Sequence, residues 1–249
     1  MQLQVSWKVD GDRRAGKELE ETFMTLILTN DDGIDAPGIQ ALLNAVGDRK
    51  TVMVAPREGL SGCGHQVITD RPIHVDRRSA TEYAIGGTPA DCTRIALSCL
   101  CPDAAWVLSG INNGGNLGID VYLSGTVAAV REAAIHGIPA VAISQYRKGG
   151  RLVEWERTTQ LAIAVLQELF DRPLEPGTFW NVNLPFLDPD EPDPKIVFCQ
   201  PSTQPLPVKY RIEDEYYYYE GVYGLRDRTP GTDVDVCFSG NIAVTLLGL

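Results

Sequence analysis

The sequence predicts an α/β protein built around a mostly parallel β-sheet. Leu26–Thr29 and Thr51–Ala55 are short apolar segments, and a helical pattern lies between them. Trp106–Ser109 and Ala140–Ser144 repeat this arrangement around a second helical pattern. Strands that alternate with helices at this spacing form βαβ units, whose crossovers favour parallel pairing.

The elements of the first half follow from local patterns. Four apolar residues after the first strand recur at the i, i+3, i+4 and i+7 positions of one helix face: Ile39, Leu42, Leu43 and Val46. Ile68–Val75 and Glu82–Ile85 then predict an antiparallel excursion from the parallel sheet. Gly86–Asp91 opens the next helix, and Asp91 is its candidate N-cap.

The second half continues with a helix that begins near Ser124. Its predicted inward residues are Val127, Val130, Ala134 and Ile135. The remaining predicted elements are a long amphipathic helix over Glu154–Phe170 and strands over Phe179–Leu184, Ile196–Gln200 and Ile242–Leu247. Residues 209–228 alternate charge with tyrosine, which predicts a two-stranded ribbon. Because an isolated hairpin is marginal in water, we expect this ribbon to pack on a partner.

The composition fits one large domain. The chain has 249 residues, of which 44% are hydrophobic, so it can bury a sizeable core. Residues 1–23 are charged and lack a signal-peptide core. We therefore expect a flexible N-terminal extension over 1–23 and a single domain over 24–249.

Charge and hydropathy argue against two classes of partner. The formal net charge of −11 disfavours DNA binding, which needs clustered Lys and Arg. No apolar run approaches the length of a membrane span. The 6 cysteines show no zinc-binding spacing, which predicts buried free thiols in a reducing compartment. These features together predict a cytoplasmic protein without a DNA or membrane partner.

Oxygen-bearing side chains follow three of the predicted strands. Asp31 and Asp32 follow the first strand, Ser61 follows the second, and Asn112 follows Trp106–Ser109. Ligands of open α/β sheets bind just beyond the carboxyl ends of the strands. Two adjacent carboxylates there are costly unless something positive holds them, and oxygen donors suit Mg²⁺ or Mn²⁺ rather than zinc. Each residue alone is an ordinary turn or loop residue, but their joint position predicts a site for one divalent ion.

The segment Gly118–Thr126 is a candidate phosphate-binding loop. Ser124, Gly125 and Thr126 stand at a predicted helix N-terminus, where free N–H groups and the helix dipole favour an anion. Gly125 would let the anion approach the backbone closely. The alternative is plain capping of the helix by Ser124.

The sequence gives little support to other catalytic arrangements. The histidines at 65, 74 and 136 form no Ser-His-Asp pattern, and each suits a structural role. No GxGxxG or P-loop motif follows a strand, which argues against dinucleotide or ATP-hydrolysing chemistry. An aspartyl-phosphate phosphatase usually has an acid two residues after its nucleophile, whereas Gly33 stands two residues after Asp31.

Four ordered blocks between Met24 and about Ser144 resemble the SurE survival-protein family. They are Thr29–Ile34; Val54–Pro56 with Ser61 and Gly64-His65; Gly87–Cys92; and Ser109–Asn112 continuing through Gly114, Asn116, Gly118 and Asp120 to Ser124–Val127. The resemblance implies a Rossmann-like core and a metal-dependent phosphatase of nucleoside monophosphates. It also implies that some members act as 3′-nucleotidases or trim short polyphosphate.

The resemblance assigns roles to particular residues. It places the metal ligands on Asp31, Asp32, Ser61 and Asn112, and the phosphate contacts on Asn116, Ser124, Gly125 and Thr126. It implies a C-terminal arm, about residues 195–249, that is exchanged between the subunits of a homodimer or homotetramer. The Gly87–Asp91 block also matches the family, but the resemblance implies no particular role for it.

Two questions stay open at this point. Residues 199–204 lack the basic side chains that the family commonly has there, so a nucleotide- or phosphate-binding module without turnover is the alternative to an enzyme. Within the enzyme hypothesis, Asp31 is the catalytic candidate, which either orients or deprotonates an attacking water or attacks phosphorus directly.

Overall fold

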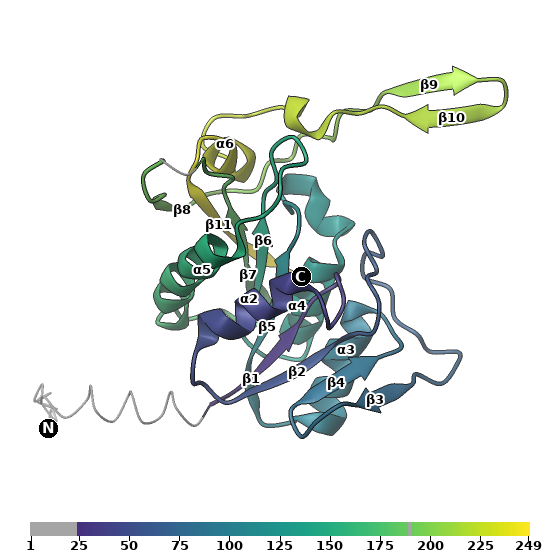
Figure 1. The fold of residues 1–249 in the computed structure, drawn as a ribbon, viewed down its shortest axis with the longest axis vertical. Coiled ribbons are helices and arrows are strands. Elements are labelled where there is room, and N and C mark those ends of the chain that lie inside the picture. Colours follow the sequence, from purple (N-terminus) through teal and green to yellow (C-terminus); the bar gives the residue numbers. More distant parts are fainter. Residues whose placement is uncertain (1–23, 189–190) are drawn as a thin grey trace, which may run out of the picture.

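The computed structural model describes residues 24–188 and 191–249. The predicted N-terminal extension, residues 1–23, lies outside this range. The described chain confirms the α/β prediction, because a nine-stranded sheet runs through it with helices on both faces (Figure 1).

The sheet is parallel through its centre and antiparallel near its edges. Its strands, in spatial order, are β3 (Val75–Arg77), β4 (Glu82–Ile85), β2 (Thr51–Pro56), β1 (Thr25–Thr29), β5 (Ala104–Asn112), β6 (Ala140–Gln145), β7 (Thr178–Leu184), β11 (Ile242–Gly248) and β8 (Ile196–Phe198). The pairings from β4 to β7 are all parallel. β3 pairs antiparallel with β4, and β11 pairs antiparallel with β7 but parallel with β8.

Helices cover the sheet on both faces. α2 (Pro37–Val46) and α5 (Trp155–Phe170) pack together on one face, whereas α3 (Pro89–Ile95) and α4 (Gly125–Ile135) pack together on the other. A π-helical turn (Ala96–Leu100) extends α3, and α6 (Asp233–Phe238) packs against β11. Successive side chains of β1 alternate between the two cores: Leu28 joins the first and Ile27 the second.

Three local predictions were wrong. Ile68–His74 forms no strand, and the antiparallel excursion begins only at Val75. Thr88, not Asp91, is the N-cap of α3, while Asp91 is the third helical residue and completes a capping box. Ile135, predicted to face inward, is 53% exposed at the end of α4.

The predicted ribbon is a hairpin of β9 (Tyr210–Glu213) and β10 (Tyr216–Tyr219). It projects from the body of the protein (Figure 1), and the side chains of both strands are exposed. By contrast, β8 and β11, which flank the hairpin in the sequence, lie in the central sheet of the same chain. None of the helices in the described residues has the length and apolar character that crossing a bilayer requires.

The topology brings three functional loops together. β2, β1 and β5 are neighbours and parallel, so their carboxyl ends lie at one edge of the sheet. Asn112, the last residue of β5, and the loops that carry Ser61 and Asp31 therefore lie at the same edge. This edge is where open α/β sheets bind ligands.

Gly110 allows β5 to lie close to β6 near this edge. Its φ is +138°, and a Cβ at this position would lie 2.3 Å from the carbonyl oxygen of Ile143. Gly47 also has a positive φ, +62°, but its Cβ would meet no atom within 4 Å. The two glycines thus share the backbone constraint and differ in the space around them.

We expect Gly110→Ala to lower the free energy of unfolding by about 2 kcal/mol more than Gly47→Ala. Both variants bear the cost of a strained φ, about 1–3 kcal/mol, but only Gly110→Ala also forces the backbone of β5 away from β6. Urea unfolding of the two variants measures the difference. Equal losses would contradict the close approach of β5 and β6.

Candidate functional site

Asp31 is a buried carboxylate at the end of β1. It is 4% exposed, and its Oδ1 accepts a hydrogen bond of 2.6 Å from the Thr126 hydroxyl in the first turn of α4. Its backbone carbonyl accepts a hydrogen bond of 2.7 Å from the Leu60 N–H. The end of β1 is therefore bonded both to the N-terminus of α4 and to the loop after β2.

The N-terminus of α4 approaches Asp31 closely because residue 125 is glycine. A Cβ on Gly125 would lie 2.8 Å from the Asp31 Cβ and 3.0 Å from the Cys63 Sγ. The 2.8 Å separation is too short for two carbon atoms, so a larger residue would push α4 away from β1. Gly125 thus sets the spacing between the helix N-terminus and the carboxylate.

The loops after β1, β2 and β5 are also bonded to one another. The Ile34 N–H donates to the Pro56 carbonyl, and a Cβ on Gly33 would lie 3.3 Å from the Gly59 nitrogen. Asp32 Oδ2 accepts a hydrogen bond of 3.0 Å from the Asn113 N–H after β5.

The other two predicted metal ligands lie on these same loops. Asn112 donates its side-chain N–H to the Gly114 carbonyl at 2.9 Å, which leaves its carbonyl oxygen free to accept or coordinate. Ser61 is exposed on the loop between Leu60, which bonds to Asp31, and Cys63, which lies near Gly125. The Ser61 hydroxyl makes no hydrogen bond within the described residues.

Burial disfavours the charged forms of Asp31 and Asp32. It raises the pKa of Asp31 from 3.8 to about 6; the Thr126 hydrogen bond opposes the shift, and the charge of Asp32 adds to it. Burial also raises the pKa of Asp32. In the part of the chain that the structure describes, neither carboxylate forms an ion pair with Lys, Arg or His. A cation between them would remove this penalty.

The donor types of the four predicted ligands fit a hard divalent cation. They are carboxylate, hydroxyl and amide oxygens, which suit Mg²⁺ or Mn²⁺. The nearby Cys63 is a neutral thiol, because burial and then the charge of Asp31 raise its pKa. Within residues 24–188 and 191–249, no three His, Cys, Asp or Glu side chains are placed to hold a metal. A cation here would thus depend on Ser61 and Asn112 in addition to the two aspartates.

Gly125 and Thr126 lie beside Asp31 at the N-terminus of α4, whereas Asn116 bonds to residues of β6 and β7. Ser124 caps α4 by accepting from the Val127 N–H at 3.1 Å, as the alternative interpretation expected. Thr126 is fully buried and its hydroxyl bonds to Asp31, so its side chain is not available to an anion. Its backbone N–H also interacts with the Asp31 carboxylate. One side-chain N–H of Asn116 donates to the Ser144 hydroxyl, which leaves the second N–H available.

A polar network that the sequence did not reveal holds the loop after β5 in place. The Asn116 N–H donates to Asn183 Oδ1 at 2.7 Å, and its carbonyl accepts from both Asn181 and Asn183. Farther along this loop, the buried Arg226 donates to Asp120 Oδ2 at 2.6 Å. These partners are more than 60 residues apart in sequence, and local patterns carry no signal for such contacts.

His65 fixes the loop after β2 to α4. Its Nε2 lies 2.8 Å from Oε2 of Glu132, which is 6% exposed on α4. Glu132 also lies 3.2 Å from His136 and 3.6 Å from Arg94. Burial alone would raise the pKa of Glu132. The interactions with His65, His136 and Arg94 outweigh burial, so the pKa is lowered. His65 thus has the structural role expected from the sequence.

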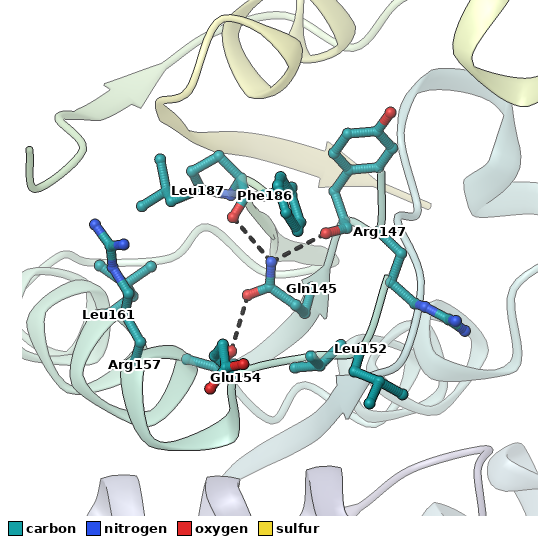
Figure 2. A pocket seen from close by; sticks show the side chains of 12 residues that line it. Gln145, Arg147, Leu152, Glu154, Arg157, Leu161, Phe186 and Leu187 are labelled. Carbon is teal, nitrogen blue, oxygen red and sulfur yellow. Dashed lines mark hydrogen bonds between the residues drawn. The ribbon is translucent and has the colours of Figure 1, made fainter. Parts of the chain in front are cut away.

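A separate cavity lies beyond the carboxyl ends of β6 and β7 (Figure 2). Its volume is about 30 Å³, which is room for about one water. Gln145 in its wall bonds to the carbonyls of Tyr146 and Pro185, and Arg157 donates to the carbonyl of Asp188. The polar groups there serve the packing of this region, so we place the functional site at Asp31 instead.

The fold and the site define a class of protein: an α/β protein that gathers oxygen donors and a helix N-terminus at the carboxyl ends of parallel strands. The chain belongs to the SurE family, because the family model described as Survival protein SurE matches residues 26–206.

Relatives and a solved structure agree with this membership. A protein of Nostoc sp. named "Putative 5'-nucleotidase alr3139" is 63% identical over 224 residues, which cover 90% of this chain and 99% of the relative. The 5'-nucleotidase SurE of Xylella fastidiosa is 40% identical and covers 89% of this chain and 88% of the relative. The crystal structure of the SurE protein from Aquifex aeolicus superposes with a TM-score of 0.79 at 30% identity, covering 90% of this chain and 93% of that one.

We expect Asp31→Asn to be more stable than the parent protein in EDTA at pH 7, by roughly 1–3 kcal/mol. The folded metal-free protein binds the Asp31 proton more tightly than the unfolded chain does, because the pKa rises from 3.8 to about 6 on folding. The parent protein therefore loses stability as pH rises through this window, and the variant lacks this loss.

Urea unfolding in EDTA between pH 4 and pH 7 measures the difference. The advantage of the variant should shrink as the pH falls towards 4. A variant that is less stable than the parent, or a difference that does not change with pH, would contradict the burial of an uncompensated carboxylate.

Proposed function

We propose that this protein is a metal-dependent phosphomonoesterase that hydrolyses nucleoside 5′-monophosphates to nucleoside and phosphate. The observation that carries the proposal is the buried carboxylate of Asp31 against the N-terminus of α4, with the half-buried Asp32 next to it. Neither carboxylate has a cationic partner among the described residues. The family relatives named 5'-nucleotidase SurE support the choice of substrate.

The proposal gives each group a task. Asp31, Asp32, Ser61 and Asn112 would hold one Mg²⁺ or Mn²⁺ per subunit. When bound, the ion would polarise a phosphoryl oxygen and lower the pKa of a coordinated water. The backbone N–H groups of Gly125 and Thr126, with the free N–H of Asn116, would stabilise charge that builds on the phosphoryl oxygens. The hydroxyl of Ser124, which already accepts from Val127, could donate its proton to the same anion.

Asp31 has two possible catalytic tasks in this scheme. It could orient or deprotonate the attacking water, or it could attack phosphorus itself. The Thr126 hydroxyl occupies Asp31 Oδ1, so either task would fall to Oδ2. Activity towards nucleoside 3′-monophosphates and short polyphosphate belongs to the same proposal, because the groups described here bind only the phosphoryl end of the substrate.

We expect Asp31→Asn and Asp32→Asn each to lower kcat for a nucleoside 5′-monophosphate at least about 100-fold, since each removes a charged ligand of the ion. Asp35→Asn is the matched control. Asp35 lies on the same loop, but its side chain is 72% exposed and pairs with Arg78. Phosphate release with Mg²⁺ or Mn²⁺, and with EDTA in parallel, measures the effect.

Near-normal turnover in both site variants, with each still folded by circular dichroism, would contradict the proposed site. Metal-dependent nucleotide binding without phosphate release from any monoester would instead favour the alternative, a binding module without turnover.

We also propose that the protein forms a homodimer or homotetramer through its C-terminal arm. The hairpin of β9 and β10 exposes tyrosines and Ile212 away from the body of the chain. Ile212 and Tyr217 are directly opposite cross-strand neighbours, so they form one apolar face of a ribbon that is marginal alone. Exchange of this arm with a second copy would cover that face.

The double variant Ile212→Asp/Tyr217→Asp should dissociate towards the monomer, because it places two charges in the apolar face. Leu152→Asp, at a residue that is 85% exposed elsewhere on the surface, should leave the assembly unchanged. Size-exclusion chromatography with light scattering gives the mass of each. A monomeric parent protein, or an unchanged mass in the double variant, would contradict the role of the hairpin.

We also propose that the protein is cytoplasmic. All 6 cysteines are free thiols. Cys92, Cys101 and Cys237 are buried as predicted, whereas Cys63 and Cys199 are half-buried and Cys99 is exposed. Free thiols of this kind are typical of a reducing compartment.

A further inference from the structure

A cavity of about 410 Å³ adjoins the candidate metal site on the side of α3 and α4. This volume lies within the range of small-molecule sites. Its wall includes Leu60 and Cys63, the residues on either side of the Ser61–Gly62 turn. Leu60 bonds to the Asp31 backbone, and Cys63 lies close to Gly125. A phosphoryl group at the α4 N-terminus would therefore have this cavity as its neighbour.

The cavity is mainly aliphatic, with cationic groups at its edge. Five apolar side chains line it besides Cys63: Pro56, Leu60, Val67, Ile68 and Ile85. Leu60 and Val67 are each 37% exposed, so apolar surface faces the opening. Arg57, Arg71 and Glu58 supply the charges.

Arg71 is free to bind a ligand. Arg57 lies 2.6 Å from His74 Nδ1, so part of its guanidinium is engaged. Arg71 is exposed and forms neither a hydrogen bond nor an ion pair with any residue that the structure describes. It is therefore an available donor beside an apolar wall, a combination that suits a flat, largely apolar group with polar edges.

The wall of the cavity is held rigid by the capping box of α3. The Thr88 hydroxyl donates to the Gln66 carbonyl at 2.6 Å, and the Ile68 N–H donates to Asp91 Oδ1 at 3.0 Å. Asp91 is 2% exposed and also accepts from the Thr88 N–H. The segment 66–68 is thus pinned to the start of α3, which gives the Gly87–Asp91 block a structural task.

From these observations we infer that this cavity is the nucleoside subsite. The base of a nucleoside monophosphate lies against Leu60, Val67 and Ile68, and Arg71 donates to its polar edge or to the ribose. The inference rests on the proposed function, because it assumes that the phosphoryl group lies beside Gly125. A polyphosphate chain fits the cavity less well, since most of its wall is apolar and Glu58 opposes the two arginines.

A second cavity of about 400 Å³ on the other side of the metal site is a poorer choice. It includes Trp155, but Asp32, Asp35 and Glu58 line it with Arg57 as the opposing cation. It also opens on the side of α2 and α5, whereas the helix N-terminus that would hold the phosphate belongs to α4 on the opposite face.

The test compares each nucleoside monophosphate with ribose 5-phosphate, which keeps the sugar and phosphate but lacks the base. We expect the parent protein to favour AMP or GMP over ribose 5-phosphate at least tenfold in kcat/KM. Val67→Trp, which fills the opening, and Arg71→Ala, which removes the free donor, should each reduce this preference about tenfold or more. Leu152→Trp, beside the separate cavity of Figure 2, is the matched control and should keep it.

An unchanged preference in Val67→Trp and Arg71→Ala would overturn the inference while leaving the phosphatase intact. If the parent protein releases phosphate from no monoester, the proposed function is wrong. The nucleoside subsite is then tested separately, by the binding of adenosine and guanosine to the cavity. Calorimetry in EDTA should then show binding that both cavity variants weaken at least about tenfold and Leu152→Trp does not. Absence of nucleoside binding in the parent protein, or equal affinity in all variants, would overturn the inference.

Discussion

The site depends on the burial of one carboxylate, that of Asp31, between the end of β1 and the first turn of α4. It is only 4% exposed, and the Thr126 hydroxyl donates a hydrogen bond to it. A buried carboxylate with a second one beside it is a costly arrangement for a folded protein. A ligand that brings positive charge relieves that cost. This cost is the physical basis of the proposed divalent-ion site.

Backbone packing brings the segments that carry the other predicted ligands to the same edge of the sheet as this carboxylate. Because β2, β1 and β5 are adjacent and parallel, their loops leave the sheet at the same edge. Glycines at 33, 59 and 125 then let these loops and α4 approach to distances that a Cβ would prevent or crowd. Asparagines on β7 and an arginine near the C-terminus secure the loop after β5 from the other side. The precision of the site thus comes from residues distant in sequence.

Much of this arrangement was predictable from the sequence, because its signals are local. The apolar runs of β1 and β2 and the helical repeat of α2 each lie within a few residues, and the order of elements implied a parallel sheet. Capping of α4 by Ser124 was the alternative to its predicted phosphate contact, and Ser124 does cap α4. The strand-end position of Asp31, Asp32, Ser61 and Asn112 was also readable, since parallel strands end at one edge.

The remaining features depend on tertiary contacts that no local pattern encodes. The hydroxyl of Thr126 bonds to Asp31, 95 positions earlier in the chain, whereas the sequence assigned it to phosphate. Ile68–His74 has strand-forming residues, yet Ile68 is held by Asp91 and packs at a cavity instead of pairing in the sheet. The buried pair of Asp120 and Arg226 links the functional loop to the segment after the hairpin, and only the fold brings these residues together.

The most direct test of this account is a crystal structure of the full chain grown with Mn²⁺ and examined by anomalous scattering. The account predicts a single manganese peak that lies about 2–2.5 Å from side-chain oxygens of Asp31, Asp32, Ser61 and Asn112. Absence of a peak there, or a peak elsewhere on the protein, would contradict it.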